Sequence, residues 1–117
     1  EELGDQVPFP ARLPAYLPSG FELLDLHLFE AKGVKSLHWR LSDGLTTLSL
    51  FMTDKGHHPE LRSAREVTLG TKQKAHLLEH PGRRTLCWTD DRVGYAMVGE
   101  LSEEELLKVA ESTVSDN

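Results

Sequence analysis

Apolar and polar residues alternate on both sides of Asp43-Gly44, over residues 36–52. An alternation with a period of two is typical of a β-strand with one buried face, and Asp-Gly is a favoured pair at the centre of a two-residue hairpin turn. With these two residues at the centre of the turn, Trp39 lies opposite Leu48, and the neighbouring apolar residues fall on the same face. The pattern therefore predicts a β-hairpin that turns one face towards the core.

The opposite face of this hairpin is polar, with one aromatic exception. The same register pairs His38 with Ser49 and Arg40 with Thr47, and it places Phe51 on their side. Cover by another part of the chain would explain an aromatic side chain there, and so would a small apolar surface for a protein or lipid partner. If the domain binds a partner, we predict that it does so through this face, which carries His38, Arg40, Thr47, Ser49 and Phe51.

Strand patterns also occur on both sides of this hairpin, at residues 21–30, 66–69, 85–89 and 93–99. Residues 75–79 have helical as well as strand composition, but the turn and the strand that follow them favour a strand. A second hairpin is predicted to pair Trp88 with Tyr95 and Leu86 with Met97. In the first strand, the alternation separates two sets of side chains, Leu24, Leu26 and Leu28 on one face and Leu23, Asp25 and His27 on the other.

A helix is predicted at the C-terminal end of the chain. Ser102 and Glu105 have the spacing of a capping box, in which the serine is the N-cap. Leu106, Val109 and Ala110 then follow at the spacing of one apolar helix face. One helix on one face of a sheet gives an α+β domain, with a curved antiparallel sheet of about six strands, or seven, and one C-terminal α-helix.

Prolines are concentrated near the N-terminus, where residues 1–20 hold four of the six in the chain. Proline at this spacing prevents a helix and favours an extended arm or linker. We therefore predict an arm over residues 1–17 and a single domain over residues 18–117. The chain begins EELGDQ, without Met, and we expect it to be a fragment of a longer protein.

The composition excludes several classes of protein. The 117 residues include 13 basic and 19 acidic side chains, which gives a net charge of −6. Nucleic-acid binding depends on a basic surface, so this chain is not predicted to bind nucleic acid. No stretch approaches the roughly 18 apolar residues that a membrane-spanning helix needs. Cys87 is the only cysteine, so an internal disulfide is impossible, and its strand position predicts a buried, unreactive thiol.

The residues that could carry chemistry are better explained by structure. His38 and Ser42 lie near opposite ends of one predicted strand and Asp43 belongs to the turn, so these three do not form a catalytic triad. His76 and His80 would lie about 13 Å apart on a strand, too far for one metal ion. The remaining pair, His57-His58, belongs to a polar loop, and the sequence has no HExxH or CxxC motif. We therefore predict no catalytic residue, no metal and no cofactor, and a protein that is not an enzyme.

Three segments in this order resemble a known family: LPAYLPSGFELLD, LSDGLTTLSLFM and VGYAMVGELSEEELLKVAEST. They are similar to the C-terminal domain of the MucB/RseB-like periplasmic sigma-factor regulators. The last segment is also similar to a related domain of unknown function, found at the extracytoplasmic ends of anti-sigma factors and of LolA-like lipoproteins. The resemblance covers roughly residues 13–113.

The resemblance implies a non-enzymatic, periplasmic or extracytoplasmic binding module of a sigma-factor regulatory protein. The implied partner is the extracytoplasmic segment of an anti-sigma factor or a neighbouring LolA-like domain. No catalytic residue belongs to the family pattern. The alternative function is that of an accessory domain of a LolA-like protein that handles lipids or lipoproteins, and a lipid ligand would then be expected.

Overall fold

The computed structural model of the chain describes residues 14–54, 64–70, 73–89 and 93–113. Within these ranges the chain forms seven strands and then one helix. The elements are β1 (Glu22–Ala31), β2 (Val34–Ser42), β3 (Thr47–Asp54), β4 (Arg65–Leu69), β5 (Gln73–His80), β6 (Arg83–Thr89), β7 (Val93–Gly99) and α1 (Glu103–Glu111).

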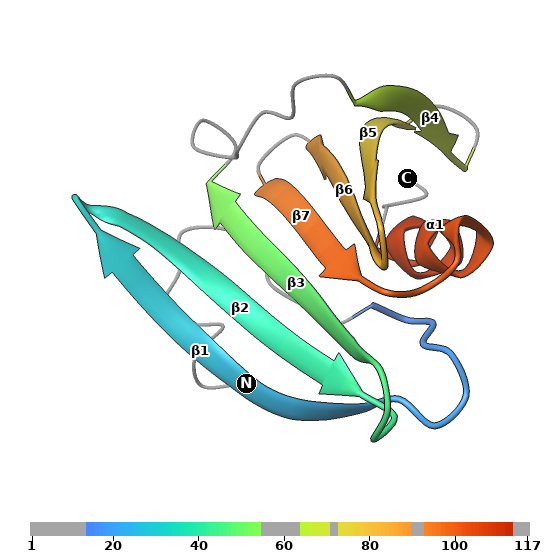
Figure 1. The fold of residues 1–117 in the computed structure, drawn as a ribbon. Coiled ribbons are helices and arrows are strands. Elements are labelled where there is room, and N and C mark those ends of the chain that lie inside the picture. The colour runs from blue at the N-terminus through green and yellow to red at the C-terminus, as the bar shows by residue number, and fades with distance from the viewer. Residues whose placement is uncertain (1–13, 55–63, 71–72, 90–92, 114–117) are drawn as a thin grey trace.

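All seven strands belong to one sheet with the order β1-β2-β3-β7-β6-β5-β4, and each neighbouring pair is antiparallel. The strands twist progressively across the sheet, and α1 lies against its β4–β6 half (Figure 1). The predicted α+β fold is therefore confirmed. The strand count is slightly higher than the six or so predicted, and the ambiguous residues 75–79 belong to β5.

The predicted arm lies mostly outside the described residues, which begin at Pro14. Leu17 packs against the core, and the Tyr16 hydroxyl donates a hydrogen bond to Glu105 Oε1 at 2.9 Å. No helix among the described residues is long and apolar enough to cross a membrane.

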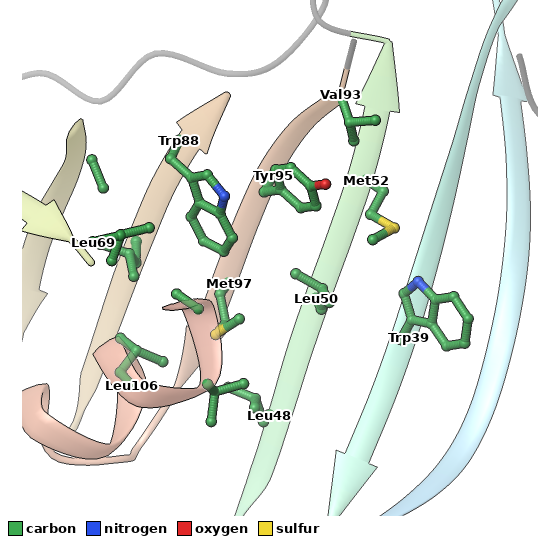
Figure 2. Close-up of a cluster of buried hydrophobic side chains, with 14 of the residues drawn as sticks. Trp39, Leu48, Leu50, Met52, Leu69, Trp88, Val93, Tyr95, Met97 and Leu106 are labelled. Carbon is green, nitrogen blue, oxygen red and sulfur yellow. The ribbon is translucent and has the colours of Figure 1, made fainter. Parts of the chain in front are cut away.

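The core lies between α1 and the sheet face that it covers, and it continues along that face to β2 (Figure 2). Every second residue of the central strands points into it, because side chains alternate between the two faces of a strand. Trp88 and Tyr95 stack across β6 and β7 with ring centroids 4.8 Å apart, as the predicted second hairpin requires. Fully buried side chains from four strands and the helix include Trp39, Leu50, Leu86, Met97 and Leu106.

Helix α1 begins where the capping box predicts. The Ser102 hydroxyl accepts a hydrogen bond from the backbone N–H of Glu105 at 3.2 Å. The helix buries Leu106, Val109 and Ala110, the three residues of its predicted apolar face.

Two side-chain contacts fix α1 to β4 and the turn after it. The Arg65 guanidinium on β4 donates to both carboxylate oxygens of Glu103, at 2.8 and 3.3 Å. The Glu111 carboxylate accepts a hydrogen bond from the backbone N–H of Gly70 at 3.0 Å. Both ends of the helix are therefore attached to the same margin of the sheet.

The register of the first hairpin differs from the prediction by two residues. Trp39 pairs with Leu50 rather than Leu48, because the connection between β2 and β3 has four residues, 43–46, instead of two. Asp43 stabilises the longer turn, since its Oδ1 accepts hydrogen bonds from the N–H groups of residues 45 and 46, at 2.9 and 2.8 Å. A shift of two residues leaves every side chain on the face predicted for it.

The predicted alternation in β1 is wrong at its N-terminal end. Leu23 pairs with Leu41 and Asp25 pairs with Arg40, so Leu24 is an extra residue in a β-bulge. Leu23 therefore shares the face of the buried Leu41, and Leu24 is 56% exposed.

Candidate protein-binding face

The five residues predicted as a partner-binding face all lie on the face of β2 and β3 opposite the core. His38 pairs directly with Phe51, and Arg40 pairs with Ser49. Thr47 lies further along β3, next to the turn, where it pairs with Ser42 rather than Arg40. We use the term outward face for these five residues and the three that β1 adds to them, Asp25, His27 and Phe29.

An aromatic row crosses three strands of the outward face. The rings of His38 and Phe51 stack with centroids 4.2 Å apart and an angle of 15° between their planes. The Phe29 ring on β1 lies 6.0 Å from His38, and the His27 ring lies 6.1 Å from Phe29. Phe29 is 49% exposed, so the part of the row on β1 is accessible from solvent.

An ion pair lies beside this row. Arg40 Nε lies 3.0 Å from Oδ1 and 3.1 Å from Oδ2 of Asp25, and its Nη2 also contacts Oδ2. These hydrogen bonds hold the pKa of the Asp25 carboxyl below its usual value and raise that of Arg40. His27 Nε2 lies 3.3 Å from the same carboxylate. The pair therefore stays charged and oriented at neutral pH.

His38 forms the centre of the row and is half-buried. Burial lowers its pKa, since the charged imidazolium loses hydration there, and the nearby Asp25 only partly offsets this. Its Nε2 is buried without a hydrogen-bond partner. A neutral ring at this place makes the middle of the outward face largely apolar.

The sequence prediction missed the contribution of β1. The dipeptide Lys32-Gly33 is the sequence signal that could have revealed it, because glycine suits the positive φ that a two-residue hairpin turn requires. In the structure both residues have a positive φ, 55° and 80°. Such a two-residue turn fixes the register of a hairpin. Counting outward from it pairs His27 with His38, and brings the rest of β1 beside the predicted face.

The other candidate residues lie elsewhere or serve the fold. The Ser42 hydroxyl accepts a hydrogen bond from the N–H of Gly44 at 2.9 Å, so it belongs to the turn together with Asp43. His76 and His80 are both exposed on β5, where they pair with Cys87 and Arg83.

Metal ligation and thiol reactivity were the remaining kinds of chemistry that the sequence raised. The described part of the chain contains no group of three or more His, Cys, Asp or Glu side chains that could hold a metal ion. His57 and His58 lie outside that part. The Cys87 thiol is buried, which raises its pKa to about 11.

The family model described as a domain of unknown function, DUF4367, matches residues 12–113. The chain belongs to this family. No curated protein matches the sequence of this DUF4367 domain. Among solved structures, the crystal structure of MucB in complex with MucA(peri) is similar over 83% of this chain, with a TM-score of 0.55 and 20% identity.

The DUF4367 domain spans 33% of that MucB chain, about a third of its length. At 20% identity the similarity shows the fold alone. The predicted MucB-like fold is therefore confirmed, whereas membership of the MucB/RseB family itself stays a prediction. What MucB binds is a property of MucB.

Proposed function

We propose that this DUF4367 domain is a non-enzymatic, extracytoplasmic protein-binding module of a sigma-factor regulatory protein. Its partner is an extracytoplasmic segment of an anti-sigma factor, and the outward face binds that segment. The observation that carries the proposal is the aromatic row on a sheet face that α1 does not cover. The structure of MucB, which has a similar fold, was solved as a complex with MucA(peri), and this supports a protein partner.

The outward face has the composition of a small protein interface. Aromatic and arginine side chains are enriched in such interfaces. Aromatic rings bury a large area at a low entropy cost, and the arginine guanidinium offers several hydrogen-bond donors in a fixed planar arrangement. Phe29 and Phe51 provide the apolar surface, and the neutral ring of His38 joins them. Arg40 is held by Asp25 at the side of the row, where it can form part of a polar rim. An apolar side chain of the partner would lie on the row, with its polar groups near Arg40.

The proposal is tested by titrating the chain with the extracytoplasmic segments of the anti-sigma factors of the same organism, using isothermal titration calorimetry. Phe29→Ser is the main variant, since this side chain is half exposed and its loss should leave the fold intact. We expect it to weaken binding at least tenfold, because it removes the most accessible apolar group of the face. Circular dichroism would verify that the variant is folded.

His76→Ser is the matched control. His76 is an exposed ring on β5 and lies on the same side of the sheet as the outward face. The strands β7 and β6 separate it from that face. It should bind as tightly as the unmodified chain. Absence of binding by the unmodified chain would overturn the proposed function. Equal losses of affinity in Phe29→Ser and His76→Ser would show that the outward face is not the site.

A further inference from the structure

The two margins of the sheet are protected very differently. β4, at one margin, has 5 residues and is attached to α1 through Arg65 and Gly70. β1, at the other margin, has 10 residues and lies far from the helix (Figure 1). No other described strand pairs with its outer side. An edge strand of this length presents a row of N–H and C=O groups that can pair with another chain.

The turn at Lys32-Gly33 indicates which groups of β1 point outward. Ala31 and Val34 flank this two-residue turn, and in such hairpins the flanking pair exchanges hydrogen bonds. Hydrogen-bonded and non-hydrogen-bonded pairs then alternate along the strand. The backbone groups of three residues are therefore directed away from β2, namely Leu26, Leu28 and Glu30.

The side chains along β1 leave apolar surface unburied. Three of the five exposed large hydrophobic side chains of the described chain belong to this strand: Leu23 at 39%, Leu24 at 56% and Phe29 at 49% exposed. Leu26 and Leu28 pack against the core but are only partly buried. A strand added to this margin would cover apolar groups on both faces of the sheet, because its own side chains would alternate as those of β1 do.

Charge indicates what kind of segment fits. Glu22 and Glu30 are exposed at the two ends of β1, and Glu30 lies directly opposite Lys35 on β2, so a basic residue on an added strand would lie beside Glu30 on the side away from Lys35. The chain as a whole carries a net charge of −6. Basic side chains on an added strand would be attracted to this margin, and like charges opposite each other are unfavourable.

We propose that the outer edge of β1, from Leu26 to Ala31, binds an extended segment of a partner protein by strand addition. The segment alternates apolar residues with Lys or Arg. It pairs with the outward backbone groups of β1 and lies beside Phe29, so that it extends the outward face by one strand. The regular part of the edge begins after the bulge at Leu24, because a bulge interrupts regular pairing. This inference rests on the proposed function, since it specifies how the same part of the sheet holds its partner.

The test uses a synthetic peptide, Lys-Val-Lys-Leu-Thr-Val-Lys, acetylated and amidated at its ends. A twin peptide carries N-methyl groups on alternate backbone amides, which removes strand hydrogen bonds and keeps the side chains. Nuclear magnetic resonance on the isotope-labelled chain would follow the amides of β1. We expect the peptide to slow hydrogen exchange at Leu26, Leu28 and Glu30 at least tenfold, and the twin to bind at least tenfold more weakly.

Two substitutions test the charge requirement. Glu30→Gln should weaken peptide binding severalfold, because it removes one negative charge from the open margin. Glu66→Gln makes the same change at the opposite margin, on β4, and should leave binding unchanged. Both side chains are exposed, so neither substitution should unfold the chain.

Three results would overturn the inference: equal binding of the peptide and its N-methylated twin, protection of β4 instead of β1, or a dimer of the chain alone whose interface protects the same β1 amides. The last result, detected by analytical ultracentrifugation with hydrogen exchange, would show that a second copy occupies the edge.

The peptide contains no anti-sigma sequence. Failure of the anti-sigma segment to bind therefore overturns the proposed function, whereas failure of the peptide overturns strand addition alone.

Discussion

His38 and Phe51 stack across β2 and β3 with their ring centroids 4.2 Å apart. The contact removes one face of the imidazole from water, and His38 Nε2 is buried without a hydrogen-bond partner. A proton on this ring would place a positive charge in a partly apolar environment, which is why burial lowers its pKa. The stack that forms the centre of the outward face therefore also makes it sensitive to pH.

The free energy of unfolding should decrease as the pH falls below about 6.5, the ordinary pKa of histidine. The pKa of His38 is lower in the folded chain, so the unfolded chain takes up the proton first and is favoured by acid. The free energy of unfolding continues to decrease until the pH reaches the pKa that His38 has in the folded chain. Asp25 opposes this shift, whereas His27 and Arg40 reinforce it. Urea unfolding at about pH 7.5 and about pH 5.5 would measure the difference in stability.

His38→Phe should make that difference smaller, because phenylalanine can keep the stack and cannot bind a proton. His76→Gln removes a different imidazole, an exposed one on β5, and serves as the matched control. A His38→Phe chain that lost as much stability between the two pH values as the unmodified chain would contradict the role given to His38.

The β2–β3 turn offers a second test. Asp43→Ala should lower the melting temperature by several degrees, because it removes the acceptor of two backbone hydrogen bonds. These bonds also lower the pKa of Asp43, so its contribution to stability is present above the usual pKa of 3.8 and is lost as the pH falls through the folded value. Leu45→Ser, at a side chain 94% exposed in the same turn, should change the melting temperature very little. Equal effects of the two substitutions in thermal unfolding would count against this account of the turn.

The faces of the strands were predictable from the sequence, but the pairing register was less so. Side-chain alternation depends only on a period of two, so the face assigned to Trp39 survived a change of its partner from Leu48 to Leu50. The turn length depends on how Asp43 bonds to the backbone, which the dipeptide Asp-Gly alone does not determine. Similarly, no alternation rule predicts the bulge at Leu24, where one residue of β1 has no partner in β2.

The candidate site was predictable to a similar degree. The pattern of one hairpin placed His38 and Phe51 on a common outward face, and the structure makes them direct neighbours. Asp25 and Phe29 were missed because their place depends on the pairing of β1 with β2. That pairing is a relation between two strands, and the alternation within either strand does not contain it.

The helix cap can be tested by substituting its serine. Ser102→Ala should lower the free energy of unfolding by about 1 kcal/mol, because it leaves the N–H of Glu105 without its acceptor. Ser102→Asp should retain most of the stability, since aspartate is an equally favoured N-cap and suits the positive end of the helix dipole. Both values can be measured by urea unfolding. Equal destabilisation by Ala and Asp would show that the side-chain acceptor is not what stabilises the start of α1.

The thiol of Cys87 should react very slowly while the chain is folded. It lies on β6 between Leu86 and Trp88, only 4% exposed, and burial raises its pKa from 9.0 to about 11. Since the thiolate is the reactive form, this change alone reduces the reactive fraction about a hundredfold at neutral pH. Alkylation by iodoacetamide at about pH 8, followed by mass spectrometry, should therefore be at least a hundredfold slower in the folded chain than in guanidinium. Cys87 is the only cysteine, so the rate is unambiguous. Comparable rates in the two conditions would mean that β6 opens readily in the native state, and that the sheet is much less rigid at its centre than its packing implies.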